Sequence, residues 1–72
     1  MVKEFHGTLK YTINGTEHEF RCRCGIFMEE FDNYEEISQY VIEKMKEYVK
    51  GRPHSGRIVF GTAAVLEGKA VR

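Results

Sequence analysis

The chain is 72 residues long, carries 11 basic against 11 acidic residues, and is 12% aromatic. A chain of this length forms one small domain with a thin core, and its apolar and charged fractions are typical of a folded protein rather than a disordered one. It has no N-terminal basic segment followed by an apolar run, and no stretch near the roughly 18 to 20 apolar residues that a membrane helix needs. We therefore expect a cytoplasmic protein that does not bind a membrane.

Two strands joined by a tight turn are predicted in the N-terminal part, over residues 2–13 and 16–26. Apolar and polar residues alternate in both strands, and the Asn14-Gly15 pair between them is typical of a two-residue type I′ turn. Such a turn fixes the register of the whole hairpin. The pairs predicted on its buried face are Leu9 with Phe20, Gly7 with Cys22, and Phe5 with Cys24.

The two cysteines of the second strand, Cys22 and Cys24, point to the same face but lie roughly 7 Å apart along it. This spacing is unfavourable for a disulfide, so we interpret both as reduced, small residues of the core. A zinc site would need about four converging ligands. The remaining candidates do not converge with the cysteines, because His18 lies about 20 Å from Cys24 along the strand and His6 points to the opposite face. We expect neither a metal nor a cofactor.

A helix is predicted over residues 33–50. Asp32 or Asn33 can cap its first turn, and a glutamate stands three residues further on, as in a capping box. Gly51 is expected to follow the helix as its C′ residue, with Pro53 preventing its continuation. The apolar stripe expected on its inner face is Tyr34, Ile37, Val41, Met45, Tyr48 and Val49.

A third strand is predicted over residues 57–66, and it is apolar on both faces. A strand that is apolar on both faces normally has another element packed on each face. This chain has a single helix, so the second face of the strand is expected to contact a partner. Strict alternation places Ile58, Phe60, Thr62, Ala64 and Leu66 on one face and Val59, Gly61, Ala63 and Val65 on the other. The candidate interface residues are Tyr40, at the edge of the helix stripe, with Val59, Ala63 and Val65.

The connections between these elements predict the topology. A right-handed crossover from the second strand through the helix places the third strand beside the first and antiparallel to it. The predicted fold class is α+β, a single ββαβ domain over residues 1–72 in which a three-stranded, largely antiparallel sheet of order 2-1-3 packs on one helix. Glu67-Gly68 suggests a further turn, with residues 69–72 as a short fourth strand.

Charge is unevenly distributed along the chain. Residues 1–28 carry four basic and three acidic residues, a net charge of +1. Residues 29–43 carry six acidic and no basic residues, a net charge of −6. Residues 44–72 carry seven basic and two acidic residues, a net charge of +5. Acids at a helix start and bases at a helix end complement the helix dipole, which explains part of this pattern. The glycine-containing basic loop over residues 50–57 is also suited to holding a phosphate. The candidate partner-binding or phosphate-binding residues are Arg21, Arg23, Lys50, Arg52, His54 and Arg57.

Catalysis is not indicated by the sequence. His54 and Ser55 are adjacent, but neighbours in sequence seldom present their side chains to each other, and no acidic residue lies near them. A chain this short also has little room for a pocket of the few hundred Å³ that ligand sites require. We therefore expect neither an enzyme nor a small-molecule substrate.

Two binding functions fit the sequence; a purely structural subunit of a larger assembly also fits the two-sided third strand and is not distinguished by sequence from the first of them. The first is a small non-enzymatic protein-binding or accessory module that self-associates as a homodimer through the third strand or the uncovered sheet face; its size suits a bacterial or phage-borne regulator. The second is a nucleic-acid-binding regulator that uses the basic loop and the hairpin arginines on phosphates. The sequence pI of about 6.8 lies well below the value of about 9 typical of dedicated nucleic-acid binders, which favours the first hypothesis.

Overall fold

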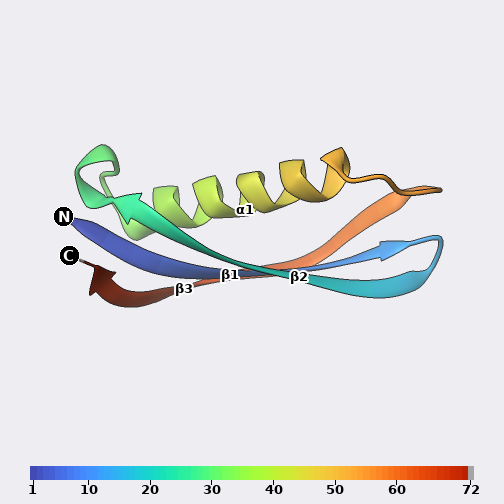
Figure 1. Cartoon of the computed structure of the whole chain (residues 1–72), viewed down its shortest axis with the longest axis horizontal. Helices are drawn as coiled ribbons and strands as arrows, with labels where there is room; N and C mark the ends of the chain where they lie inside the picture. The colour runs from blue at the N-terminus through green and yellow to red at the C-terminus, as the bar shows by residue number, and fades with distance from the viewer. Residues whose placement is uncertain (72) are drawn as a thin grey trace.

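The protein is a two-layer α+β domain, seen in a computed structural model that describes residues 1–71, with the side chains of residues 1–68. Its elements are β1 (Val2–Ile13), β2 (Thr16–Phe27), a short 3₁₀ turn η1 (Met28–Glu30), α1 (Tyr34–Gly51) and β3 (Ile58–Val71). The sheet has the order β2-β1-β3 with both pairings antiparallel, and α1 lies along one of its faces (Figure 1). The predicted fold class and strand order are confirmed.

The β1–β2 hairpin forms in the predicted register. Asn14 and Gly15 have φ angles of 52° and 81°, the left-handed pair that a type I′ turn requires. Ile13 lies opposite Thr16, and the pairing continues without interruption to Val2 opposite Phe27. The three predicted buried-face pairs are all present.

The start of α1 has the predicted cap, whereas its end differs from the prediction. The Asn33 side chain accepts a hydrogen bond from the Glu36 backbone N–H at 3.0 Å, and the Glu36 carboxylate accepts one from the Asp32 backbone N–H at 3.3 Å. At the other end Gly51 is the last helical residue rather than a left-handed residue beyond the helix. Arg52 takes an extended conformation instead, because the proline that follows it disfavours helical geometry.

The core lies between α1 and the sheet. Four helix residues are buried, as the stripe predicts, and pack on four residues of the strands; the set is Ile37, Val41, Met45 and Val49 with Phe5, Leu9, Ile26 and Val65. A Cβ atom on Gly7 would lie 2.8 Å from the Met45 sulfur and 3.0 Å from a Val41 methyl, so the absence of a side chain at Gly7 allows α1 to lie this close to β1. Tyr34 and Tyr48, also assigned to the stripe, lie at its margins and are exposed.

β3 departs from the prediction in length and in the assignment of its faces. It continues to Val71, which pairs with Val2, so the predicted turn at Glu67-Gly68 and the fourth strand are wrong for the residues described; Arg72 lies outside them. Its register with β1 shifts twice, once opposite Lys10 and once opposite Glu4. Each shift inserts an extra β3 residue, which is the definition of a β-bulge.

The first bulge exchanges the two faces of β3. Phe60 pairs with Tyr11 and Ala63 pairs with Leu9, so Gly61 and Thr62 together oppose Lys10. Before the bulge, Ile58 and Phe60 pack on the core; after it, the residues that do so are Ala63 and Val65. The predicted strict alternation is therefore wrong beyond Gly61, because one inserted residue reverses the direction of every later side chain.

The molecule is long and thin. Its principal extents are 40 × 19 × 19 Å, and its radius of gyration is 13.4 Å, against about 11 Å for a compact domain of this length. Both follow from a single helix covering one face of a long, twisted sheet (Figure 1). The other sheet face, which we call the open face, is not covered by any element among the described residues.

Candidate functional site

The open face combines residues of all three strands. Alternation along β1 and β2, and the bulge in β3, determine which side chains it presents. They are Glu4, His6, Thr8, Lys10 and Thr12 from β1, Glu17, Glu19, Arg21 and Arg23 from β2, and Val59, Thr62, Ala64 and Leu66 from β3. The β2 side of the open face is therefore charged, and its β3 side is largely apolar.

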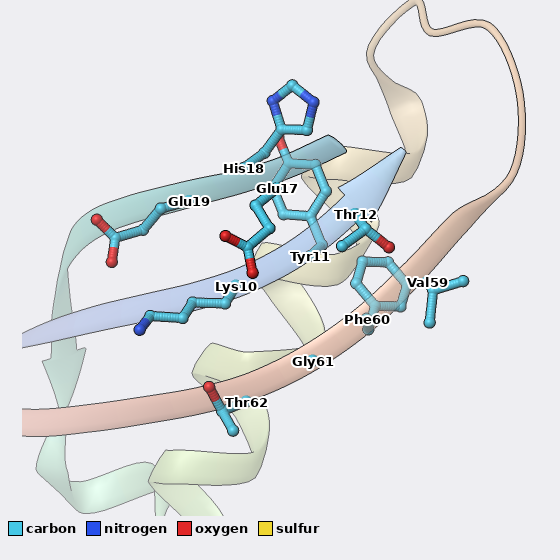
Figure 2. Close-up of a pocket in the computed structure, with 10 residues that line it drawn as sticks. All are labelled: Lys10, Tyr11, Thr12, Glu17, His18, Glu19, Val59, Phe60, Gly61 and Thr62. Atoms are coloured by element: carbon cyan, nitrogen blue, oxygen red, sulfur yellow. The ribbon is translucent and has the colours of Figure 1, made fainter. Parts of the chain in front are cut away.

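The β3 side of the open face is an exposed apolar row. Val59 and Leu66 keep 53% and 69% of their surface exposed, and Thr62 and Ala64 lie between them on the same face and are also exposed. At the hairpin end, the twist of the sheet forms a shallow hollow of about 550 Å³, so the expectation that this chain has little room for a hollow of ligand-site size is wrong. Figure 2 shows this hollow, with Lys10 and Glu17 on one side and Val59 and Phe60 on the other.

The charges on the open face form local pairs. Arg21 lies 3.0 Å from a Glu19 carboxylate oxygen, and Arg23 lies 4.0 Å from Glu4. The His6 Nε2 atom is 2.7 Å from the other Glu4 oxygen. The hydrogen bond from His6, with the charge of Arg23, lowers the pKa of Glu4 below its ordinary value of 4.5.

The basic loop lies at the opposite end of the molecule from the Glu4–Arg23 pair. The Lys50 ammonium is 5.6 Å from the centre of the Phe60 ring, and the Arg52 guanidinium is 5.7 Å from the centre of the Tyr48 ring, both within cation–π distance. The His54 Nδ1 atom is 2.9 Å from the Arg52 carbonyl oxygen. Two of the loop's basic side chains therefore lie against aromatic rings.

The loop is held by the hairpin turn. The Asn14 side chain donates a hydrogen bond to the Ser55 carbonyl at 3.0 Å, and the Asn14 backbone N–H donates to the Arg57 carbonyl at 3.4 Å. Gly56 has a φ of +98° and packs directly against the Asn14 side chain. This fixes the loop beside the turn, roughly 20 Å along β2 from Arg21 and Arg23.

The six predicted phosphate-binding residues therefore fall into two groups. Arg21 and Arg23 lie on the open face, whereas Lys50, Arg52, His54 and Arg57 belong to the loop end of the molecule. The structure does not bring them into one positive surface.

The predicted interface residues are also divided. Val59 is exposed on the open face, and Tyr40 is 43% exposed on α1, where its ring packs on Phe31 with a centroid distance of 5.3 Å. Ala63 and Val65 face α1 instead, and the Val65 carbonyl accepts a hydrogen bond from the Tyr34 hydroxyl. Ala63 and Val65 therefore lie on the helix-covered face of the sheet and not on the open face, because of the bulge described above.

The residues that take their place on the open face, Ala64 and Leu66, were missed as interface candidates. The glycines of the strand could have predicted the bulges, because an isolated glycine inside a strand often marks a bulge or a close backbone approach. Gly61 and Gly68 sit at the two bulges, where an added Cβ would lie 3.2 Å from the Lys10 carbonyl oxygen and 2.8 Å from that of Glu4.

The cysteines are free thiols on the helix side of β2. Both are half-buried and pack against the core. Burial, with the neighbouring Cys22 thiol, raises the pKa of Cys24 above its ordinary value, so the reactive thiolate is disfavoured. Within the described residues, no three His, Cys, Asp or Glu side chains gather closely enough to hold a metal ion, and α1 lacks the apolar length needed to cross a membrane.

No protein-family model, curated protein or solved structure matches this chain.

Proposed function

We propose that this protein is a non-enzymatic protein-binding module that self-associates and whose open face binds an amphipathic helix of a partner protein. The observation that carries this proposal is the exposed apolar row of Val59, Ala64 and Leu66 on an otherwise polar sheet face. Exposed apolar side chains gathered along one strand of a small soluble domain are typical of an interaction site.

The shape of the row favours a helix as the bound segment. From Val59 to Leu66 it extends roughly 20 Å, about the length of four helical turns, and it is only one strand wide. A narrow apolar row matches the stripe of an amphipathic helix, whose polar flanks would meet Lys10, Thr8 and His6 on the neighbouring strand. Addition of a partner strand at the β3 edge is less favourable, because two bulges interrupt its regular geometry.

The open face is better suited to protein than to nucleic acid. The row is aliphatic, whereas bases stack on exposed aromatic side chains. Arg21 and Arg23 lie near carboxylates of the same face, so the positive charge available to phosphates is reduced. These features favour the protein-binding function over the nucleic-acid-binding alternative.

The surroundings of the cysteines and of His54 favour a binding function over an enzymatic one. The Cys24 thiol has a raised pKa, and the His54 ring contacts a backbone carbonyl rather than a nucleophile. A nucleophile needs a base within hydrogen-bond distance and a group that orients that base. Neither cysteine nor His54 has such an arrangement among the described residues.

The experiment that tests the proposal uses a photo-cross-linking amino acid at Leu66, with the same group at the exposed Glu43 of α1 as the matched control. Both proteins are irradiated in extract of the host cell, and any protein captured only through position 66 is then purified and titrated against the wild type. Burying a leucine stabilises by about 1.5–3 kcal/mol, so Leu66→Asp should weaken that binding roughly tenfold or more, whereas Glu43→Lys should not change it.

Three results would count against the proposal. Equal capture at both positions, or none at position 66, would remove the open face as a protein-binding surface. Capture that disappears after nuclease treatment would replace the proposal with the nucleic-acid-binding function.

A further inference from the structure

The outer edge of β2 is suited to pairing with another strand. β2 ends the sheet on one side, with β1 as its neighbour, and no other strand of the described residues lies beyond it. Its register is continuous from Thr16 to Phe27, whereas that of β3 shifts twice. A regular edge strand presents a row of unpaired N–H and C=O groups, and bulges at an edge oppose such pairing. The β2 edge is therefore better suited to strand pairing than the β3 edge.

The charges of β2 are self-complementary. In the segment EHEFRCR, Glu17 and Glu19 precede Phe20, and Arg21 and Arg23 follow it, with all four charges on the open face. If two copies of β2 pair antiparallel about a twofold axis at Phe20, Glu17 lies opposite Arg23 of the second copy and Glu19 lies opposite Arg21 of the second copy. Symmetry repeats each contact. Every charge of the segment then faces an opposite charge, an arrangement that stabilises cross-strand pairs.

The hydrogen-bonding pattern of β2 permits this register. The type I′ turn makes Ile13 and Thr16 a hydrogen-bonded pair, and bonds alternate sides along an antiparallel strand. The even-numbered residues of β2 thus bond to β1, and the odd-numbered residues direct their N–H and C=O groups to the free edge. An axis at Phe20 pairs odd residues with odd residues, as this geometry requires.

Neighbouring registers are less favourable. An axis at Glu19 or at Arg21 also keeps the hydrogen-bonding pattern, but it places that residue against its own copy. Like charges directly opposite each other destabilise a strand pair. The charge pattern therefore selects the register centred on Phe20 over its two neighbours.

The existing ion pair within β2 is compatible with this arrangement. Arg21 lies 3.0 Å from Glu19 on the same strand. In the dimer, the Glu19–Arg21 pair of one copy lies beside that of the second copy with the charges reversed. The four groups then alternate in sign around a square, so the internal pair is kept and cross-strand pairs are added to it.

Exposed aromatic surface lies beside the β2 edge, on the helix side of the sheet. The Phe20 ring stacks on Tyr48 with a centroid distance of 4.9 Å, and Tyr48 remains 55% exposed. A hollow of about 250 Å³ lies between β2 and α1, lined in part by Phe20, Cys22, Tyr40 and Tyr48. An axis at Phe20 would place the two Phe20 side chains as a non-hydrogen-bonded pair, the closest kind of cross-strand neighbour. The second copy would then cover exposed aromatic surface as well as pair charges.

We infer that this protein forms a twofold dimer in which β2 pairs antiparallel with β2 of a second copy about an axis at Phe20. The two sheets become one six-stranded sheet, with both helices on one side and both open faces on the other. The inference rests on the self-association part of the proposed function and places it at β2, whereas the sequence assigned it to the third strand or the uncovered face. Partner binding by the open face is a separate question.

Charge reversal tests the register. The dimer dissociation constant is measured by sedimentation equilibrium across a dilution series for Glu19→Arg, Arg21→Glu and the double variant, with Glu43→Arg as a control that changes net charge as Glu19→Arg does. Each single change places like charges opposite each other twice and should weaken the dimer roughly tenfold or more. The double variant exchanges the charges and should restore wild-type affinity. Circular dichroism verifies that each variant is folded.

A cysteine introduced at position 18 tests the axis directly. His18 lies opposite Cys22 of the second copy in a non-hydrogen-bonded pair, where Cα atoms are about 4.5 Å apart, within the range for a disulfide. Oxidised His18→Cys should therefore form a covalent dimer. Within one chain, positions 18 and 22 are about 13 Å apart along the strand and cannot be bridged. Glu17→Cys, which faces Arg23 rather than a cysteine, is the control and should not cross-link.

The outcomes separate the inference from the proposed function. A dimer that the single reversals weaken and the double variant restores, with a covalent dimer only for His18→Cys, supports the inference. A dimer that none of these variants affects would overturn the β2 interface and leave self-association through another surface. A monomer of 8.4 kDa at all concentrations would overturn both the inference and the self-association part of the proposed function.

Discussion

The contact between the hairpin turn and the basic loop makes Gly56→Ala the most informative single substitution for the fold. Gly56 has a φ of +98°, and a Cβ atom there would lie between 2.1 and 2.4 Å from the atoms of the Asn14 side chain. The substitution therefore strains the backbone and displaces Asn14, whose side chain holds the loop through the Ser55 carbonyl.

The expected loss can be estimated from these two effects. A residue with a side chain at positive φ costs about 1–2 kcal/mol, and the lost hydrogen bond of Asn14 costs about 0.5–1.5 kcal/mol. A destabilisation of roughly 2–3 kcal/mol is a large part of the total of about 4–11 kcal/mol expected for 72 residues. It corresponds to a fall in Tm of roughly 10–20 °C for a domain of this size.

Urea unfolding and thermal melts at one fixed protein concentration would measure this loss, because the proposed self-association would make Tm depend on concentration. The same substitution in an Asn14→Gly background should cost only the backbone part, about 1–2 kcal/mol, since Asn14→Gly removes the clash and keeps the turn. Gly51→Ala is the matched control: no atom lies within 4 Å of its added Cβ, and it should be neutral or slightly stabilising. An equal cost of Gly56→Ala in both backgrounds would refute the role assigned to the Asn14 contact.

Three further predictions address the helix cap, the bulge and pH. Asn33→Ala should lower the free energy of unfolding by about 1 kcal/mol through loss of the cap of α1, and an unchanged urea midpoint would contradict this. Val65→Ser should cost about 1.5 kcal/mol or more, whereas Leu66→Ser should stay within about 0.5 kcal/mol; the reverse order in urea unfolding would show that the bulge is misplaced. Glu4→Gln should destabilise at pH 7. This difference should shrink as the pH falls below 4.5, because the pKa of Glu4 is lowered in the folded state and its stabilisation is lost on protonation. A difference that does not change between pH 7 and 3 would show that the pairing with His6 contributes nothing.

Local rules were sufficient for the hairpin, for the start of the helix and for the centre of its buried stripe. The Asn14-Gly15 turn fixes the register because only a type I′ geometry continues the twist of both strands, and the alternation of β1 and β2 agrees with that register. The cap at Asn33 and the buried spacing of Ile37, Val41 and Met45 likewise depend on residues a few positions apart. These features follow from short-range geometry, which the sequence contains directly.

Tertiary pairing decided which residues form the candidate surfaces. Residues 57–66 are apolar throughout, so alternation could not choose a core face for Val65 or Leu66; the bulge at Gly61, formed against β1, made that choice. Pairing also continued β3 through Gly68 instead of allowing a turn there. The self-complementary charges of β2 were present in the sequence, but the role proposed for them in a dimer depends on strand order, because only an edge strand can use them. The sequence by itself determined the hairpin, the helix and its N-cap, whereas long-range pairing decided the extent of β3 and which faces and edges remained exposed, because those depend on the neighbours that each strand acquires.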